Sequence, residues 1–473
     1  MSGIRSVRAL MEFEDAEADL LLEPVPGSES LLWPLGRWPV LSALTSGEVG
    51  TTAAVRERQP LRNRVLKAVR RALPNPRLAR RAPHADHLFL VSGWTRTPVA
   101  DGYENWLVDD FARALGEDAV VVQDAYVDLL SRGHERPTLP RTYTYAREGE
   151  RVVRATKPLR EHERARVEQV VREWFARIDV ETTTAARDRA VTDIVGRAAA
   201  VPAAELSFAR LLDRVRPHRL YVQTAAYGER SPLVRMAHAS GIEVWEPQHG
   251  FLGPDHGAYN MGRAMSSPAL RDHVPDTLLT FGEFWQEGLS FPGRVIPVGK
   301  PSLDRLSRTA PGYEDRPKRV LFVSNRYRHD RLEDVVLALR AALPGWTIAI
   351  RPHPTERSTI RANVPRIADL PGVEFDDTAD ASAALSRARL VVGFFSTMLY
   401  EALAYACHVA VVETHASNAY ASERVFPLRI GDETDVSAVV AATAGPPAAS
   451  EREAASRVWR PDPVRAFLDA ARL

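Results

Sequence analysis

Three short turns of this 473-residue chain combine residues that bind ligands or move protons, and each follows an apolar run. The turn 351–354 reads Arg-Pro-His-Pro, and 394–397 reads Phe-Phe-Ser-Thr. In the earlier half of the chain, 246–250 reads Glu-Pro-Gln-His-Gly. Short apolar runs are typical of buried parallel strands, and ligands of open α/β sheets gather beyond the carboxyl ends of the strands. The three turns are therefore predicted to lie where a ligand binds.

The two later turns carry groups that suit a phosphate. Arg351 offers a two-pronged cation, and His353 offers an imidazole held between two prolines, the second being Pro354. Ser396 and Thr397 are predicted to open a helix whose first N–H groups and dipole favour an anion. The alternatives are a histidine that is satisfied by backbone and a serine that only caps the helix.

Three more residues are candidates for the same ligand. Ser324 and Arg326 follow the first strand expected in the later half, where the guanidinium is placed to neutralise a diphosphate. Glu401 lies one helical turn beyond Thr397 and is placed to accept hydrogen bonds from ribose hydroxyls. For Arg326 and Glu401 the alternative is an ordinary surface side chain.

The earlier turn carries the candidate for proton transfer. His249 has an ordinary pKa of about 6.5 and can act as a general base on a hydroxyl. Its alternatives are binding of the donor phosphate and a structural role. Asp255 and His256 lie in a nearby Gly-Pro-Asp-His-Gly loop. Either is a candidate to orient His249 or to be the base itself.

Three residues around this turn are predicted to contact an acceptor. Gln248 and Gly250 flank His249, and glycine would let the backbone turn sharply where a substrate approaches. Trp94 follows another apolar run, 87–91, and so belongs to an equivalent strand end.

Strand and helix patterns alternate twice along the chain, which predicts the α/β class with a helix-covered parallel sheet in each half. We expect four regions. They are an accessory module with a basic helix at 1–85, a Rossmann-like acceptor domain at 86–299, a Rossmann-like donor-nucleotide domain at 300–450, and a C-terminal helix at 451–473 that packs back towards the acceptor domain.

The first of these regions holds two distinct patterns. The stretch 20–44 is rich in Leu, Pro and Trp and is interpreted as a short strand-and-turn module or a small accessory domain. Lys and Arg crowd the segment 56–81, where apolar residues recur at helical spacing. This basic amphipathic helix is either a surface helix packed on the core or a contact with an anionic membrane surface or an anionic polymer, nucleic acid being the least favoured alternative.

Charge, cysteine content and apolar runs bear on the partners and the location of the protein. A formal net charge of +1 gives no case for a nucleic-acid partner. The single cysteine, Cys407, excludes an intrachain disulfide and is expected to be a buried small hydrophobe. No stretch approaches the roughly 20 apolar residues of a membrane helix, and 1–18 lacks the apolar core of a signal peptide. We therefore expect a cytoplasmic protein, peripheral to the plasma membrane if the basic helix binds lipid.

Several nucleotide and metal motifs are missing from the sequence. There is neither a Gly-rich dinucleotide motif nor a phosphate-cradling Gly-Lys-Ser/Thr loop, so hydride transfer and ATP hydrolysis have little support. No Asp-x-Asp pair follows an expected strand. We therefore predict no cofactor and no metal.

The turns resemble motifs of GT-B glycosyltransferases of bacterial surface-polysaccharide synthesis, and above all those of the capsule polysaccharide and CDP-glycerol glycerophosphotransferase group. In that group a Gln-His-Gly-type turn, here 248–250, carries the proposed base. An Arg-x-His-Pro turn, here 351–354, binds the donor, and a Ser/Thr pair, here Ser396 and Thr397, holds phosphate. The later two motifs are also similar to those of sialyl- and polysialyltransferases, which use CMP-activated sugars. The segment 298–306 resembles the Gly-x-Pro-x-x-Asp linker of the group.

The resemblance implies a metal-independent GT-B enzyme whose two Rossmann-like domains face one another across a cleft. The implied donor is a nucleotide-activated sugar or polyol, CMP- or CDP-linked, and the implied acceptor is a hydroxyl of a glycan or lipid-linked glycan. His249 would take the acceptor's proton. Two alternatives stay open: a nucleotide-sugar epimerase of the same architecture, and a non-catalytic subunit of glycan assembly.

Overall fold

The structure is a computed structural model that describes residues 2–45, 82–123, 137–144, 146–326, 328–378 and 380–472. The basic helix expected at 56–81 lies outside the described residues. The chain divides into two compact units. Unit 1 comprises residues 1–280, 285–298 and 464–473, and unit 2 comprises residues 281–284 and 299–463.

Unit 1 is built on a parallel seven-stranded sheet in the order β5-β4-β1-β6-β7-β8-β9. Its strands are β1 (His87–Val91), β4 (Ala119–Gln123), β5 (Thr142–Thr144), β6 (Arg219–Val222), β7 (Glu243–Pro247), β8 (Thr277–Thr280) and β9 (Arg294–Pro297). A separate hairpin consists of β2 (Arg96–Val99) and β3 (Gly102–Asn105). Leu88 and Leu90 of β1 enter one core, whereas Phe89 and Val91 enter the other. Burial on both faces explains the unbroken apolar runs of the sequence.

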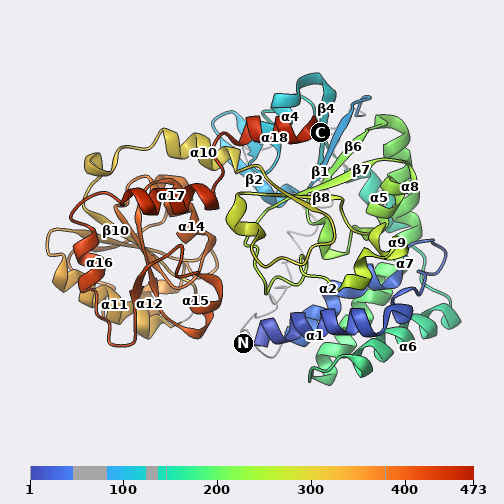
Figure 1. The fold of residues 1–473 in the computed structure, drawn as a ribbon, viewed down its shortest axis with the longest axis horizontal. Coiled ribbons are helices and arrows are strands. Elements are labelled where there is room, and N and C mark those ends of the chain that lie inside the picture. Colours follow the sequence, from blue (N-terminus) through green and yellow to red (C-terminus); the bar gives the residue numbers. More distant parts are fainter. Residues whose placement is uncertain are drawn as a thin grey trace. The chain divides into compact units, whose positions relative to one another are not determined.

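Helices cover both faces of this sheet (Figure 1). One core takes Phe208 from α7 and Val234 from α8, and the opposite core takes Phe111 from α4 and Phe467 from α18. The helices of unit 1 are α1 (Ser2–Ala16), α2 (Leu32–Thr45), α4 (Asp109–Leu115), α5 (Ala146–Ala155), α6 (Glu161–Arg177), α7 (Thr184–Val215), α8 (Ser231–Ala239), α9 (Pro268–Arg271) and α18 (Pro463–Ala471).

The strand-and-turn interpretation of residues 20–44 is wrong, because most of the apolar residues form the helix α2. Buried side chains surround this helix, so no polar face marks its period in the sequence. Pro34 lies in its first turn, where proline is tolerated, and the helix continues through Pro39. Trp33 is fully buried, and its ring centroid lies 4.9 Å from that of Trp174 of α6.

Unit 2 is built on a parallel six-stranded sheet in the order β12-β11-β10-β13-β14-β15. Its strands are β10 (Arg319–Val323), β11 (Thr347–Arg351), β12 (Val373–Phe375), β13 (Leu390–Gly393), β14 (His408–Val412) and β15 (Leu428–Ile430). Its helices are α10 (Pro301–Arg308), α11 (His329–Ala342), α12 (Ile360–Asn363), α13 (Ala381–Leu385), α14 (Thr397–Ala404), α15 (His415–Tyr420), α16 (Ser437–Ala442) and α17 (Ala449–Val458). As expected, Cys407 is buried, in the loop before β14.

The two sheets are wound in the same way. In each, the first strand lies inside the sheet, and later strands are added on both of its sides. The predicted α/β class with two Rossmann-like domains, the domain type of GT-B proteins, is confirmed. That the domains face one another across a cleft stays a prediction.

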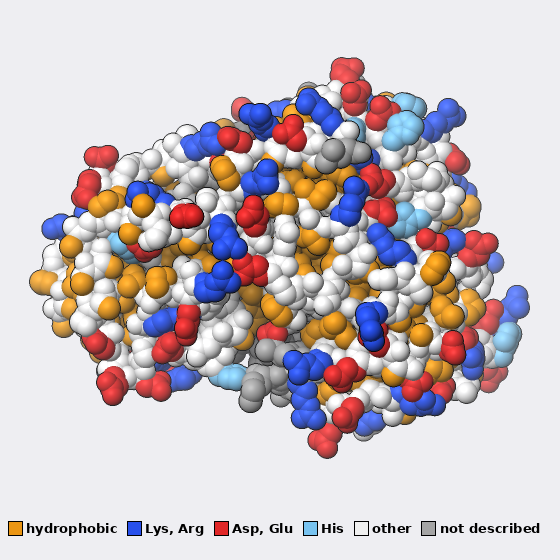
Figure 2. All heavy atoms as spheres, in the orientation of Figure 1, with side chains coloured by type: hydrophobic (Ala, Val, Ile, Leu, Met, Phe, Trp, Pro, Cys, Tyr) orange, Lys and Arg blue, Asp and Glu red, His pale blue; other side chains and the backbone are white. Residues whose placement is uncertain are grey.

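The surface carries charges of both signs. On the face drawn in Figure 2, Lys and Arg side chains are interspersed with Asp and Glu. Within the described parts of the chain, no helix combines the length and the apolar composition needed to cross a membrane.

Candidate functional site

The carboxyl ends of β11, β10 and β13 lie side by side in unit 2, because β10 pairs with both of the other strands. Neighbouring strands are about 4.8 Å apart, so the turns after these strands share one short edge. The direction of winding reverses between β10 and β13, and ligands of doubly wound sheets bind at such a reversal. The topology therefore brings Ser324, Arg326, His353 and Ser396 to one edge.

Ser396 is the N-cap of α14, as its position after a buried strand predicts. Its backbone is extended, and its Oγ accepts a hydrogen bond of 3.2 Å from the backbone N–H of Met398. Thr397, the first residue of the helix, is exposed. The start of α14 thus has a preformed cap and an exposed first residue, an arrangement that suits an anion.

The positive charge of Arg326 acts on His353 across this edge. Partial burial, followed by the positive charge of Arg326, lowers the pKa of His353 below its ordinary value. The imidazole is therefore neutral at pH 7, with its Nδ1 2.8 Å from Oγ1 of Thr355. Arg326 is exposed and has a φ of 72°, a strained conformation that is frequent at binding sites. Pro354, the next residue of the turn, is exposed to solvent and is not part of the core.

Ser324 begins the adjacent turn, directly after β10. The residue is only 4% exposed, and its Oγ has no hydrogen-bond partner. A buried hydroxyl without a partner can still donate to a ligand. Ser324 stays a candidate for the ligand of this edge.

Arg351 is a correction to the prediction from the sequence. Its side chain is buried, and its Nη1 donates to Oδ2 of Asp376 at 2.8 Å and to Oγ1 of Thr378 at 3.0 Å. Burial alone would raise the pKa of Asp376, but hydrogen bonds from Thr378 and Arg351 lower it. The guanidinium is therefore committed to a buried ion pair, and we withdraw it as a phosphate ligand.

Glu401 is a second correction. Its Oε1 lies 2.6 Å from Nζ of Lys300, and both side chains are largely buried. The ammonium also lies within 6 Å of the rings of Phe281 and Trp459, at 5.7 and 5.9 Å from their centroids. Glu401 therefore holds the start of α10 against α14, and is neither a free surface glutamate nor a free acceptor for ribose.

The carboxyl ends of β1, β6 and β7 form the corresponding edge of unit 1. The side chain of Gln223, at the end of β6, accepts a 2.8 Å hydrogen bond from the backbone N–H of Ser92, after β1. Trp94 rises from the same turn and is 54% exposed. Its indole lies edge-on to the imidazole of His249, with ring centroids 5.5 Å apart. Two residues predicted to serve the acceptor are therefore neighbours.

His249 is poised as a neutral group. Burial lowers its pKa to about 4, so the imidazole is uncharged at pH 7 and able to accept a proton. Its Nδ1 is buried and has no hydrogen-bond partner. The ring is held by packing instead, against Trp94 and against Tyr227, whose ring centroid lies 5.4 Å away.

Asp255 does not orient His249, because no hydrogen bond joins the two side chains where the structure describes them. His256 of the same loop is connected to His249 through Tyr227. Its Nε2 lies 3.0 Å from the hydroxyl of Tyr227, which packs on His249. Tyr227 itself was missed from the sequence, although it follows the end of β6 and the strand-end argument applies to it equally.

Of the residues flanking His249, Gln248 has a role other than the one expected, whereas contact of Gly250 with an acceptor stays a prediction. Gln248 is buried, and its amide donates to the carbonyl of Gly250 at 2.7 Å, so it stabilises the turn instead of facing an acceptor. Gly250 has no positive φ, and a side chain there would meet no atom within 4 Å. The fold does not require glycine at this position, and the open space lies directly beside His249.

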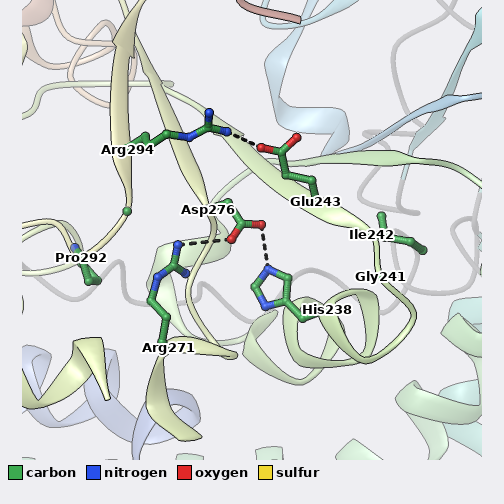
Figure 3. A pocket seen from close by; sticks show the side chains of 9 residues that line it. His238, Gly241, Ile242, Glu243, Arg271, Asp276, Pro292 and Arg294 are labelled. Carbon is green, nitrogen blue, oxygen red and sulfur yellow. Dashed lines mark hydrogen bonds and ion pairs between the residues drawn. The ribbon is translucent and has the colours of Figure 1, made fainter. Parts of the chain in front are cut away.

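A hollow of about 610 Å³ lies at the opposite edge of the unit 1 sheet (Figure 3). Its charged residues precede or begin strands β7, β8 and β9. Asp276 binds His238 at 2.9 Å and Arg271 at 3.2 Å, and Glu243 pairs with Arg294. These charged side chains form ion pairs with one another, and none of the site residues predicted from the sequence lines this hollow. In the described residues, no group of three or more His, Cys, Asp and Glu side chains is arranged to hold a metal.

Comparisons with known proteins give distant likenesses. The sequence matches no family model and no curated protein. The solved UDP-GlcNAc 2-epimerase of Methanocaldococcus jannaschii is similar at a TM-score of 0.45 and 12% identity, over 82% of this chain and 98% of that one. The calicheamicin glycosyltransferase is similar at a TM-score of 0.44 and 15% identity, over the same shares of the two chains, 82% and 98%. At this distance the likenesses carry no conclusion about activity.

Proposed function

We propose that this protein is a glycosyltransferase, or a polyol-phosphate transferase, that moves a group from a nucleotide-activated donor to a hydroxyl of a cell-surface glycan. One observation carries the proposal: the strand ends of the two units bear complementary chemistry. Unit 1 presents a neutral imidazole beside an exposed indole, His249 and Trp94. Unit 2 presents a cation, a second neutral imidazole and a capped helix start, Arg326, His353 and Ser396.

Unit 2 is the proposed site of the donor. The backbone N–H of Thr397, the positive end of the α14 dipole and the guanidinium of Arg326 would bind the phosphates, and the same groups would stabilise the charge that grows on the leaving nucleotide. Ser396 accepts a hydrogen bond through Oγ, which leaves its O–H proton available to donate to a phosphate oxygen. Because these fixed groups neutralise the leaving phosphate, the proposed reaction uses neither metal nor cofactor. The resemblance of the two turns favours a CMP- or CDP-linked donor.

Unit 1 is the proposed site of the acceptor. The acceptor oxygen forms a bond to the transferred group while the bond from that group to the nucleotide phosphate breaks, and the phosphate leaves with the electron pair. The acceptor proton passes to the neutral imidazole of His249. With a pKa of about 4 this imidazole is a weak base, so the proton moves late, when the hydroxyl has become acidic through bond formation. The proposed place of action is the inner face of the plasma membrane, where lipid-linked acceptors lie.

The proposal is tested with the intact protein, a series of nucleotides and product analysis. Stabilisation against heat by CMP or CDP, and nucleotide release that requires a glycan acceptor, would support it. Conversion of the donor sugar without any acceptor would identify an epimerase instead. Normal polymer synthesis by a His249→Ala, His353→Ala double variant would identify a non-catalytic assembly subunit.

A further inference from the structure

A buried ion pair between α1 and α2 binds the loop that carries His256. The carboxylate of Glu14 is fully buried and accepts hydrogen bonds from Nε of Arg37 at 2.6 Å and from the backbone N–H of Gly262 at 2.7 Å. Arg37 also donates to the carbonyl oxygens of Gly257 and Asn260. The first two helices thus bind the loop 253–262 at three points of its backbone.

Three glycines show how closely α1 and α2 pack against the rest of unit 1. A methyl group added at Gly228, Gly257 or Gly262 would overlap atoms of α1 or α2. The atoms belong, in that order, to Pro34, Leu41 and Glu14. Two of these glycines lie in the loop of His256, and the third directly follows Tyr227. Close packing without room for one methyl group transmits small displacements.

Aromatic rings continue the contact from α2 to His249. The indole of Trp38, on α2, lies 4.4 Å from the ring of Tyr227 and 6.0 Å from that of His256. The hydroxyl of Tyr227 is 3.0 Å from Nε2 of His256, and its ring packs on His249. A continuous set of contacts therefore leads from the N-terminal helices to the imidazole.

We propose that α1 and α2, acting through Trp38, Tyr227 and His256, position the imidazole of His249 for the transfer reaction. The proposal rests on the proposed function of His249 and gives the N-terminal helices a role in it. Because Nδ1 of His249 has no hydrogen-bond partner, its orientation depends on the rings that pack against it. Tyr227 and His256 are positioning residues, since they act through His249.

The decisive variant is Tyr227→Phe, which removes one oxygen and keeps the ring. We expect kcat to fall about tenfold, since a misplaced catalytic group is costly, while KM for the donor stays unchanged. The matched control is Tyr221→Phe, which removes a similar bond, 3.2 Å long, from a tyrosine hydroxyl to His87 at the start of β1. The control should keep wild-type kcat.

A second variant changes the contact between α1 and the loop that carries His256. Gly262→Ala should push α1 away from the loop and also lower kcat, whereas Gly196→Ala on α7, where no atom lies within 4 Å, should not. The orientation of His249 is read directly from the NMR signal of its ring in histidine-labelled protein, assigned with His249→Ala. Both test variants should shift this signal, and neither control should.

The outcomes separate the two proposals. An unchanged His249 signal and unchanged kcat in Tyr227→Phe and Gly262→Ala would overturn the positioning role. If the signal shifts in these variants but the wild-type protein transfers nothing from any donor, the positioning role stands and the proposed function fails. Unchanged stabilisation of the variants by nucleotides would show that unit 2 is intact.

Discussion

The indole of Trp94 lies edge-on against the imidazole of His249, with ring centroids 5.5 Å apart and ring planes at 82°. The indole is largely exposed, whereas Nδ1 of the imidazole is buried. An exposed aromatic face beside a proton acceptor suits a sugar ring, whose C–H groups pack on the indole while a hydroxyl reaches the imidazole. In the proposed reaction, this pair would link acceptor binding to proton transfer.

Trp94→Ala should raise KM for the acceptor about tenfold, because it removes an exposed aromatic surface of the kind that carries binding energy. KM for the donor should hardly change, and Trp94→Phe should have an intermediate effect. Steady-state kinetics with both substrates varied measures this. Leu206→Ala, which alters another exposed apolar side chain of unit 1, is the control. A rise in the KM of the donor alone would contradict the assignment.

His249→Ala should lower kcat by a factor of 10² to 10⁴, the usual contribution of a general base. The free energy of unfolding should not fall by more than about 2 kcal/mol, because the variant also removes a buried nitrogen without a partner. Rate measurements and urea unfolding of the same preparations test both statements. A variant that turns over at the wild-type rate would exclude proton transfer by this residue.

The rate of transfer should depend on pH in an uncommon way for a histidine base. Protonation of His249 abolishes its ability to accept a proton, and burial lowers its pKa to about 4. As pH falls, kcat/KM should therefore stay level well below pH 6.5, the ordinary histidine pKa, and decline only as pH 4 is approached. A decline centred near pH 6.5 would show that a solvent-exposed histidine controls the rate instead.

Ser396→Ala should have two effects that a simple cap would not combine. Loss of the bond to the N–H of Met398 should cost about 1 kcal/mol of unfolding free energy. Nucleotide affinity, measured by calorimetry with CMP or CDP, should also fall. Thr183→Ala removes the corresponding cap of α7 in unit 1, a bond of 3.2 Å to Ala186, and should affect stability alone. Equal nucleotide affinities in the two variants would reduce Ser396 to a cap.

Arg351 and Arg326 should respond to substitution in opposite ways. Arg351→Ala leaves the buried carboxylate of Asp376 without its cation, which should cost about 3 to 5 kcal/mol of unfolding free energy. Arg326→Ala removes an exposed cation and should change stability by less than about 0.5 kcal/mol. It should nevertheless weaken nucleotide binding about tenfold, as expected for one charged hydrogen bond. Equal stabilities of the two variants would contradict the structure of this edge.

More of the fold than of the candidate site could be predicted from the sequence. Strands buried on both faces, such as β1 and β13, give unbroken apolar runs, and the residues after them mark the predicted ligand edge without knowledge of the strand order. The helix α2 could not be predicted by the same argument, because its residues are buried all round and its prolines imitate a loop.

The roles of single side chains depended on partners that lie far away in the sequence. The carboxylate that neutralises Arg351 comes from Asp376, at the end of β12, and the ammonium that neutralises Glu401 comes from Lys300. Strand-end position alone does not reveal such partners. Tyr227 shows the converse, since its proposed role comes from a hydroxyl contact with His256 and from ring contacts with Trp38 and His249.

The helix α18 has a consequence for how the protein is made. Its Phe467 is fully buried in the first unit, stacked on Phe111 at 4.3 Å, although the whole of the second unit is encoded between them. During translation the earlier sheet must therefore wait with one apolar face incomplete until 463–471 has left the ribosome. Nascent chains stalled before this point should recruit chaperones and be open to proteases, even when most of unit 1 has already been synthesised.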